Sequence, residues 1–526
     1  MDTKALRQKI LGLAIRGKLV PQDPNDEPAS VLLERIRAEK QQMVKDGKLK
    51  PKDIKNDTII FVGEDNLHYE KFQDGSVKCI EDEIPFDVPE GWEWCRVRDI
   101  AAVKGGKRLP KGVGFSPCRT AHAYIRVTDM KNHSINTDDL KYISEEVFLQ
   151  IKNYTISKDD LYVTIAGTIG VTGEVPTELD GMNLTENAVK ITNIQINKTY
   201  LCLIIQSEFV QQQFQDKTHQ VAMPKLALER ILSTLIPVCT ITTQSAMVSK
   251  FVEMDSLINQ IREEKEILAE TVSLTKSKIL DLAIRGQLVP QDPNDEPASV
   301  LLERIRAEKE ELIKAGKIKR DKKESIIFRG EDNSYYQQTG TLIENINDWN
   351  LDDIPINWEL CCLGEICDYG NCVNVDTKDI DEEAWVLDLE DIEKDSGKVI
   401  HKIRKYERDS SSTKHLFKKG QVLYSKLRPY LNKVVLADEE GFCTSEILPL
   451  NFSNVVEPQY ALYYLMSPTF LKYANRCSYG VKMPRLGTAD GRKAVFPLPP
   501  FEEQRRISQH ISKIFIEIDN ISNMLL

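Results

Sequence analysis

Twenty-two consecutive residues of this chain, LVPQDPNDEPASVLLERIRAEK, occur twice without a single change, at 19–40 and again at 288–309. Partial matches extend the identity on both sides: ILGLAIRGKLVPQ pairs with ILDLAIRGQLVPQ, and IIFVGEDN pairs with IIFRGEDN. Further along, DVPEGWEW pairs with DIPINWEL, and VAMPKL pairs with VKMPRL. A repeat of this kind predicts that the chain folds as two copies of one structural module.

The middle of each module differs from its counterpart, over 100–220 in the first copy and 366–480 in the second. Both middles contain short segments rich in β-branched residues, such as AYIRVTDM and QVLYSKLRPYLNKVVLA, which predict short strands. We therefore expect an α/β (α+β) fold in which two globular domains of different sequence lie between nearly identical borders. A chain of 526 residues is in any case too long for a single core.

The borders of the modules carry an apolar stripe with helical spacing. Over 244–285 the stripe persists for more than four heptads, as in a coiled-coil seam, and such a helix would be about 60 Å long. The two chain ends repeat the two halves of this stripe, so the segments follow a circular order. Together the end helices would pair antiparallel with the long one and give pseudo-twofold symmetry. The alternative is a long amphipathic helix packed on a globular core. The predicted seam consists of Leu6, Ile10, Leu13, Phe251, Met254, Ile258, Ile261, Leu268, Val272, Ile279, Leu282, Ile507, Ile511, Ile514, Ile518 and Ile521.

This order predicts five segments along the chain. They are an N-terminal half helix with the first repeat element (1–50), a first variable domain (51–240), a central long helix with the second repeat element (241–318), a second variable domain (319–500) and a C-terminal half helix (501–526).

The repeated 22 residues predict a proline-rich turn followed by a short helix, for which Ser30 is a suitable N-cap and Gly47 a suitable end. Because the same element follows each end of the long helix, we expect it to be a docking surface for two copies of one partner. A structural strut at a hinge, or a recent duplication, would also explain the identity. The candidate docking residues are Gln22, Asp26, Glu27, Gln291, Asp295 and Glu296.

The net charge of −11 taken alone argues against a nucleic-acid partner. Both variable middles nevertheless contain windows with six bases and no acid, at 104–126 and 410–437, and a third window at 472–493 has six bases and one acid. Basic loops with small residues suit phosphate contacts and the reading of base edges; the alternative is a solvated basic face. The candidate DNA-binding residues are Lys104, Lys107, Arg108, Lys111, Arg119, Arg126, Lys225, Lys414, Lys418, Lys419, Lys426, Arg428, Lys433, Lys482 and Arg485. For Lys225 and Arg485, a conformational role of the Met-Pro turn is an equal alternative.

Signals of catalysis and metal binding are missing from the sequence. It contains no phosphate-binding loop, no dinucleotide turn and no (N/D)PP(Y/F) tetrapeptide. The 11 Cys include no CxxC pair, and the cluster Cys361, Cys362, Cys367 and Cys372 fits no common zinc spacing. We expect no catalytic residue and no metal site in this chain. No apolar run approaches the length of a membrane helix and no secretory leader is recognisable, so a cytoplasmic location without a membrane partner is expected.

The arrangement as a whole resembles the DNA-specificity (S) subunit of a type I restriction–modification enzyme. The similarity rests on two divergent domains, near-identical helical borders, circular order, LAIRGKLVPQ, GWEW opening a variable domain and PLPPFEEQRRI closing one. The resemblance implies that each variable domain reads one half of a split, asymmetric site in double-stranded DNA, and that the coiled coil fixes the spacer. It further implies docking of two modification (methyltransferase) subunits and of restriction (translocase/nuclease) subunits. S-adenosylmethionine, ATP and magnesium would belong to those partners.

Three other readings remain open at this point. The chain could be a coiled-coil scaffold whose basic loops bind acidic proteins, or an enzyme with a degenerate site. It could also be the specificity chain of a related system that is not type I.

Overall fold

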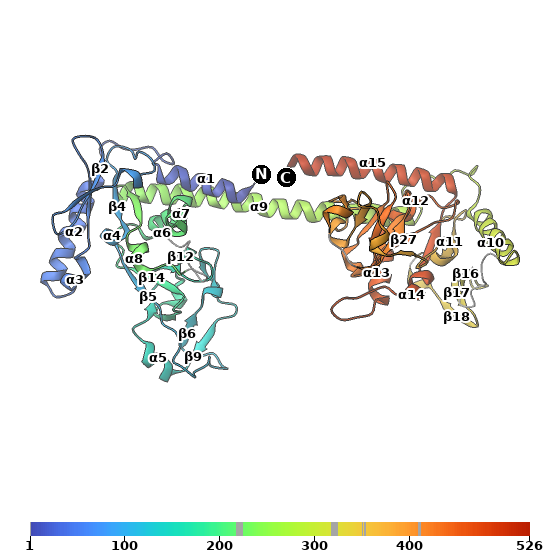
Figure 1. Cartoon of the computed structure of the whole chain (residues 1–526), viewed down its shortest axis with the longest axis horizontal. Coiled ribbons are helices and arrows are strands. Elements are labelled where there is room, and N and C mark those ends of the chain that lie inside the picture. The colour runs from blue at the N-terminus through green and yellow to red at the C-terminus, as the bar shows by residue number, and fades with distance from the viewer. Residues whose placement is uncertain are drawn as a thin grey trace. The chain divides into compact units, whose positions relative to one another are not determined.

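A computed structural model describes residues 2–216, 225–316, 324–349, 351, 354–408 and 412–525 (Figure 1). The chain divides into two compact units, unit 1 (Met1–Glu263) and unit 2 (Glu264–Leu526), and each is considered separately below. The two units repeat one order of elements at their borders and differ between them, which confirms the repeated-module prediction.

Unit 1 begins with three helices and a three-stranded antiparallel sheet, and the variable domain follows. Its helices and strands are α1 (Thr3–Ile15), α2 (Ala29–Lys45), α3 (Pro51–Ile54), β1 (Ile59–Val62), β2 (His68–Lys71), β3 (Val77–Cys79), β4 (Glu93–Arg96), α4 (Val97–Ile100), β5 (Ala102–Gly105), β6 (His122–Ile125), β7 (Met130–Lys131), β8 (Ser134–Ile135), β9 (Lys141–Ile143), α5 (Glu145–Ile151), β10 (Thr155–Ile156), β11 (Leu161–Thr164), β12 (Thr172–Glu174), β13 (Met182–Leu184), β14 (Ala188–Thr192), α6 (Lys198–Gln206), α7 (Glu208–Asp216), α8 (Leu228–Leu232), β15 (Leu235–Val238) and the start of α9 (Ile241–Ile284).

Unit 2 repeats this plan with different strands in its middle. Its elements after α9 are α10 (Ala298–Lys314), β16 (Ser325–Arg329), β17 (Tyr335–Thr339), β18 (Leu342–Asn345), β19 (Glu359–Cys362), α11 (Leu363–Ile366), β20 (Val373–Val375), β21 (Trp385–Leu387), β22 (Ile403–Arg404), β23 (Lys414–Phe417), β24 (Val422–Ser425), the 3-10 turn η8 (Pro429–Leu431), β25 (Val434–Leu436), β26 (Gly441–Thr444), β27 (Ile447–Leu450), α12 (Pro458–Met466), α13 (Pro468–Cys477), α14 (Thr488–Lys493), β28 (Val495–Leu498) and α15 (Phe501–Leu525).

The sheets show where the two units agree and where they differ. Each unit has a three-stranded border sheet, β1-β2-β3 or β16-β17-β18, and a two-stranded antiparallel pair, β4–β15 or β19–β28. The variable middle of unit 1 contains two four-stranded sheets, β10-β13-β6-β9 and β12-β11-β14-β5. The middle of unit 2 contains a five-stranded sheet, β20-β23-β26-β21-β22, and a three-stranded sheet, β25-β24-β27.

The repeated turn before α2 depends on a glycine in the left-handed region. Gly17 has a φ of +65°, and a Cβ at this position would lie 2.4 Å from Cγ of Pro89. Gly286 repeats both features with a φ of +68° and Pro355. A side chain at either position would be strained and would collide with the proline that precedes the tryptophan motif. The glycine of the turn and the proline of the motif are therefore required together.

The short helix of the repeat element starts earlier than predicted. Pro28 is the N-cap residue and makes no side-chain cap bond, so Ser30 lies inside α2 and is not the cap. The amide of Ala29, the first helical residue, donates to the carbonyl of Gly91 at 2.8 Å, so this free N–H is satisfied by a distant backbone group and not by a Ser or Thr side chain. The predicted end is confirmed, because α2 stops at Lys45 and Gly47 adopts a φ of +72°.

The long helix predicted over 244–285 is confirmed as α9, Ile241–Ile284. In unit 1, Ile10 and Leu11 of α1 pack against Phe251 and Ile258 of α9, and Leu203 of the variable domain joins the same cluster. In unit 2, Ile507 and Ile511 of α15 belong to the core of the globular domain, together with Leu280 and Ala283 of α9. The border helices therefore pack on their own globular domain as well as on α9; the antiparallel coiled coil remains a prediction.

Two predicted seam positions are wrong. Leu13 is 37% exposed and Ile521 is 57% exposed, whereas the adjacent Ala14 and Ser522 are buried. A straight helix drifts from the strict seven-residue repeat, so the buried face moves to the adjacent position toward the helix ends. The other predicted seam residues are buried or half-buried.

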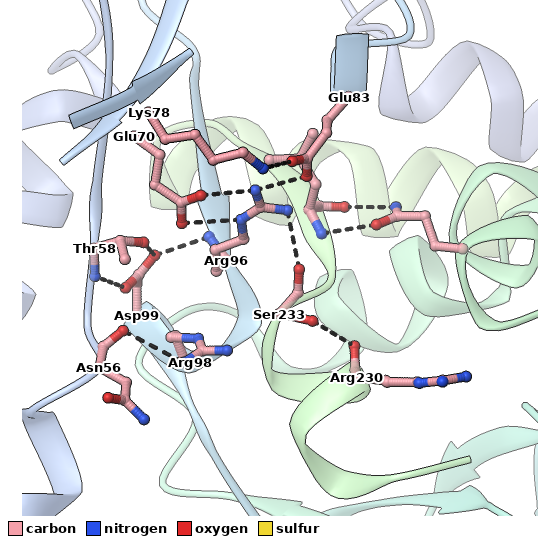
Figure 2. Close-up of polar contacts among 12 residues, drawn as sticks. Asn56, Thr58, Glu70, Lys78, Glu83, Arg96, Arg98, Asp99, Arg230 and Ser233 are labelled. Atoms are coloured by element: carbon pink, nitrogen blue, oxygen red, sulfur yellow. Dashed lines mark hydrogen bonds and ion pairs between the residues drawn. The ribbon is translucent and has the colours of Figure 1, made fainter. Parts of the chain in front are cut away.

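A buried ion-pair network closes the border of unit 1 (Figure 2). Arg96 at the end of β4 is 4% exposed. Its Nε and Nη2 contact Glu70 at 3.2 and 2.9 Å, Nη2 lies 2.8 Å from Glu83, and Nη1 donates to the carbonyl of Ser233 at 3.0 Å. Three acceptors surround one guanidinium, which compensates the cost of burying it.

Unit 2 fills the same places with neutral residues. Cys362 occupies the end of β19 where Arg96 ends β4, and Gln337 lies in β17 where Glu70 lies in β2. Gln337 Nε2 contacts Cys362 Sγ at 3.0 Å and donates to the carbonyl of Lys493 at 2.8 Å. Lys493 and Ser233 both lie two residues before the closing strand, so their carbonyls are equivalent. In unit 1 this carbonyl accepts a hydrogen bond from Arg96, and in unit 2 it accepts one from Gln337.

The replacement of the Arg96–Glu70 pair of unit 1 by the Cys362–Gln337 pair in unit 2 predicts how unit 1 responds to mutation. Arg96→Cys alone leaves the Glu70 carboxylate buried without its cation, and should lower the free energy of unfolding of unit 1 by about 3 to 5 kcal/mol. Glu70→Gln combined with Arg96→Cys installs the pair of unit 2 and should restore most of that loss. Hydrogen–deuterium exchange of the β2 and β4 amides measures both variants within the full chain, and equal loss of protection in the two would contradict the account.

Candidate nucleic-acid interface

In unit 1, the side chains of two predicted cations, Arg108 and Lys225, contact the turn between β13 and β14, and the backbone of a third, Lys107, is bonded beside it. Arg108 Nε lies 2.6 Å from the carboxylate of Glu186, and Lys225 Nζ donates to the Glu186 carbonyl at 3.3 Å. The Lys107 amide donates to the carbonyl of Leu184 at 2.9 Å, one residue before the same turn. All three basic residues are exposed, whereas the Glu186 carboxylate that Arg108 contacts is half-buried, so this surface presents positive charge to solvent.

Aromatic residues support this cluster. The Tyr124 hydroxyl donates to the Lys107 carbonyl at 2.7 Å, and burial raises the pKa of Tyr124 to about 12, so the phenol keeps its proton. The ring of Phe115 lies 5.8 Å from that of Tyr124 and is itself exposed. Tyr124 is therefore a structural support, and Phe115 is the aromatic residue that faces solvent.

In unit 2, the equivalent turn between β26 and β27 organises a second cluster of predicted cations. The Arg485 guanidinium contacts Glu446 at 2.7 and 3.1 Å. The Lys426 amide donates to the Glu446 carbonyl at 3.0 Å, and the Arg428 amide donates to the carbonyl of Pro484 at 2.7 Å. Two domains of different sequence therefore gather cations of the Met-Pro segment at topologically matching turns.

Several other predicted cations are exposed but are not joined to these clusters by a contact that the structure shows. Lys418 and Lys419 lie in the turn between β23 and β24, and Arg119 lies over the ring of Tyr142 at 5.8 Å. Lys104 is exposed on β5; Lys111 and Lys482 are exposed in loops. Met223 and Pro224 fall outside the described residues.

Three predicted DNA-binding residues are bound by acceptors of their own unit, and for Lys414 the structure contradicts the prediction. Lys414 is 2% exposed and its Nζ lies 3.0 Å from Asp388, which makes contact with DNA impossible without unfolding. Lys433 Nζ is half-buried and donates to the Leu389 carbonyl at 2.6 Å. Arg126 pairs with Asp129 at 2.6 Å beside its own strand. Counting charges along the sequence could not reveal the acceptors of Lys414 and Lys433, because Asp388 and Leu389 come from a distant segment, whereas Asp129 lies just beyond the window that ends at Arg126.

The candidate docking residues are partly occupied by contacts within their own unit. Asp26 accepts from the hydroxyls of Thr240 and Thr243 at 3.0 and 2.9 Å, and Gln22 accepts from the Trp92 indole at 2.8 Å. In unit 2, Asp295 pairs with Arg506 at 2.5 Å and Gln291 donates to Glu503 at 2.6 Å. Asp26, Gln291 and Asp295 fix the repeat element to the start of α9 or to α15, and Gln22 fixes it to the tryptophan motif, as the strut interpretation requires.

Glu27 and Glu296 are the two exposed carboxylates of the set; Gln22 and Gln291 are exposed as well. Glu27 pairs with Arg35 of α2 at 2.6 Å, and Glu296 pairs with Arg304 of α10 at 2.8 Å. Docking of a partner on the repeat element stays a prediction.

Sequence reasoning missed the two organising carboxylates, Glu186 and Glu446, and the exposed apolar residues around the second Met-Pro segment. The repeated VAMPKL and VKMPRL motif was the available signal, but it gave no partner for its base.

Within the described parts of the chain, no group of three or more His, Cys, Asp or Glu residues is placed to hold a metal ion. All 11 cysteines are free thiols, and burial raises the pKa of Cys362 to about 12. Among the helices that the structure describes, none is both long enough and apolar enough to cross a membrane.

The contrast between exposed and buried lysines makes a prediction. Lys418→Gln with Lys419→Gln should weaken binding of the full chain to a random-sequence DNA duplex, and should make the slope of log K against log salt shallower by roughly 1 to 2. Fluorescence anisotropy at several salt concentrations measures both effects.

Two controls sharpen this measurement. Lys314→Gln with Lys513→Gln removes the same charge from the exposed faces of α10 and α15 and should leave the slope unchanged. Lys414→Gln should lower thermal stability rather than the slope. An unchanged slope for the Lys418/Lys419 pair would remove that turn from the interface.

Comparison with known proteins agrees with this architecture. Residues 89–270 and 355–525 match the family model described as "Type I restriction modification DNA specificity domain". The EcoEI specificity subunit of Escherichia coli is 29% identical over 414 residues, and the match spans 69% of this chain but only 61% of that protein. The EcoAI specificity subunit, also from Escherichia coli, is 26% identical, with 97% of this chain and 88% of that protein covered.

A solved structure supports the same fold. It is described as "Structural basis underlying complex assembly and conformational transition of the type I R-M system" and matches with a TM-score of 0.51 at 16% identity, over 84% of this chain and 94% of that chain. The two segments that match the family model cover well over half of the sequence and coincide with the two variable domains and the helices that follow them. The resemblance inferred from the motifs is confirmed, and the chain belongs to the type I restriction–modification DNA specificity family.

Proposed function

We propose that this chain is a non-catalytic, sequence-specific DNA-binding subunit of a type I restriction–modification complex, in which each variable domain reads one half of a bipartite DNA site. The observation that carries this proposal is the repeated cation cluster, at Glu186 in unit 1 and at Glu446 in unit 2. Two domains that share little sequence have both retained bases at matching turns, which a merely solvated surface does not require. Cations at exposed turns suit phosphate contacts, and arginine can also read guanine.

The two half-sites should differ in sequence. The variable domains have different sheets and different exposed residues around their clusters. An asymmetric, bipartite target follows, rather than a palindrome. Because α9 begins in one unit and ends in the other, its 44 residues make it the element whose length would set the spacer. A coiled coil of α9 with α1 and α15 belongs to this proposal.

The catalytic steps would then belong to partner subunits. Two methyltransferase subunits would dock on the two copies of the repeat element, and restriction (translocase/nuclease) subunits would join them. S-adenosylmethionine, ATP and magnesium would be bound by those partners. The relatives named above are specificity subunits of restriction enzymes, which supports this division of roles.

Selection from a random duplex library, with the full chain co-expressed with its methyltransferase, tests DNA recognition. We expect one motif made of two different short halves around a fixed spacer. Lys107→Gln with Arg108→Gln should weaken selection of one half, and Lys418→Gln with Lys419→Gln should weaken the other. A scaffold protein would enrich no motif, and loss of both halves from either pair of substitutions would contradict independent reading.

Partner docking has its own test. Glu27→Arg and Glu296→Arg reverse the exposed charges of the two repeat elements without touching the Asp26 and Asp295 contacts. Native mass spectrometry of the co-expressed complex should show two methyltransferase copies for the parent chain, one for either single variant and none for the double variant.

Glu146→Arg on the exposed side of α5 makes the same charge change away from the repeat elements and should keep both copies. Two copies in the double variant would mean that these glutamates contribute nothing to docking and that the element is a strut.

A further inference from the structure

The Met-Pro segment of unit 2 forms a small closed loop with a fixed base. Tyr479 and Arg485 face each other in an antiparallel bridge, with reciprocal backbone hydrogen bonds of 3.1 and 2.9 Å. The bridge closes residues 480–484 into a tip, which begins at Gly480 with a φ of +102°. The tip is therefore a defined element of the surface.

The base of the tip is held from several directions. The Arg428 amide donates to the Pro484 carbonyl at 2.7 Å, and the Leu486 amide donates to the Lys426 carbonyl at 3.0 Å. The Arg485 side chain binds Glu446 with two nitrogens and also donates to the Met483 carbonyl at 3.1 Å. These contacts fix the direction of the tip before any ligand arrives, which lowers the entropic cost of binding.

The tip exposes apolar side chains instead of burying them. Val481 is fully exposed, Tyr479 is 64% exposed and Met483 is 44% exposed, while Tyr430 on the adjacent η8 turn is 47% exposed. Single exposed apolar residues are ordinary, but several on one rigid loop mark a contact surface.

The charges around the tip indicate the chemistry of its partner. Lys482 lies between the two exposed apolar residues of the tip, and Lys426, Arg428 and Arg485 surround its base. The neighbouring carboxylate, Glu446, is already paired with Arg485. An apolar point within a cationic surface suits DNA, which offers phosphates to the cations and, in the major groove, the thymine 5-methyl group to an apolar side chain.

The backbone beside the tip is strained in a way that fits a binding role. Arg428 adopts a φ of 49°, which is uncommon for a residue with a long side chain. Its Nε is buried and has no hydrogen-bond partner within the described part of the chain. Strain and an unsatisfied donor of this kind gather at ligand sites, where the surrounding structure over-determines them.

We propose that Val481 and Met483 read thymine in the second half-site by apolar contact with its 5-methyl group, while the cations around the tip hold the adjacent phosphates. This inference rests on the proposed DNA-recognition function. It assigns base reading to two residues that carry no charge and that a search for bases alone would leave out.

Uracil provides the test, because it pairs like thymine but lacks the 5-methyl group. The full chain, co-expressed with its methyltransferase, is used to select from two random duplex libraries, one synthesised with thymidine and one with deoxyuridine. We expect the parent chain to prefer thymine at one or more positions of the unit 2 half-site and to lose that preference in the deoxyuridine library. The unit 1 half-site, identified by the Lys107/Arg108 variant, serves as the internal reference.

Substitutions then connect the preference to the tip. Val481→Ala and Met483→Ala should each weaken binding to the selected thymidine duplex by about fivefold, and should have no effect on its deoxyuridine analogue. Val77→Ala, at an exposed valine in the border sheet of unit 1, makes the same chemical change and should alter neither. The Val481 and Met483 side chains are outside the core, so these variants should fold like the parent.

The possible results separate this inference from the proposed function. A bipartite motif in which the unit 2 half shows no thymine preference, or one that uracil leaves unchanged, would overturn the role of the tip and retain DNA recognition. Equal weakening of the thymidine and deoxyuridine duplexes by Val481→Ala would also overturn methyl reading, and would make the tip a general contact. No enriched motif in either library would reject the proposed function itself.

Discussion

The antiparallel pairing of β4 with β15, and of β19 with β28, is the interaction on which the rest of each unit depends. It places Trp94 opposite Pro237 in unit 1 and Leu360 opposite Pro497 in unit 2. Strands that are separated by the whole variable domain are therefore neighbours. Because the two ends of the domain are joined in this way, its middle can change without disturbing the helices that follow.

The border around these strand pairs is preserved in geometry more strictly than in chemistry. Gly17 and Gly286 cannot vary, because their backbone conformation and the adjacent proline leave no space for a side chain. The buried network beside the closing strand does vary: Arg96 with Glu70 in one unit becomes Cys362 with Gln337 in the other. Both pairs satisfy the same backbone carbonyl, so the constraint is the hydrogen bond and not the charge.

The periodic and repeated features of the sequence predicted much of this architecture. The repeat, the long helix and the glycine end of α2 could all be predicted, because each depends on residues close together in the chain. Leu13 and Ser30 could not be assigned correctly, because helix drift is a detail of local geometry and the amide of Ala29 is satisfied by the distant carbonyl of Gly91. The predicted interface was the weakest part: whether Lys414 is free or buried depends on Asp388, and the position of Arg485 depends on Glu446, 39 residues away. Windows of charge do not contain that information.

The central claim is that two different domains in one chain each contribute half of a DNA specificity. Methylation-sensitive long-read sequencing of the source genome, with and without this gene, tests it most directly. The account predicts that removing the gene abolishes one methylated motif, composed of two unlike short halves around a fixed spacer. Loss of a palindromic or continuous motif, or no change in methylation while the partner methyltransferase is demonstrably active, would contradict it.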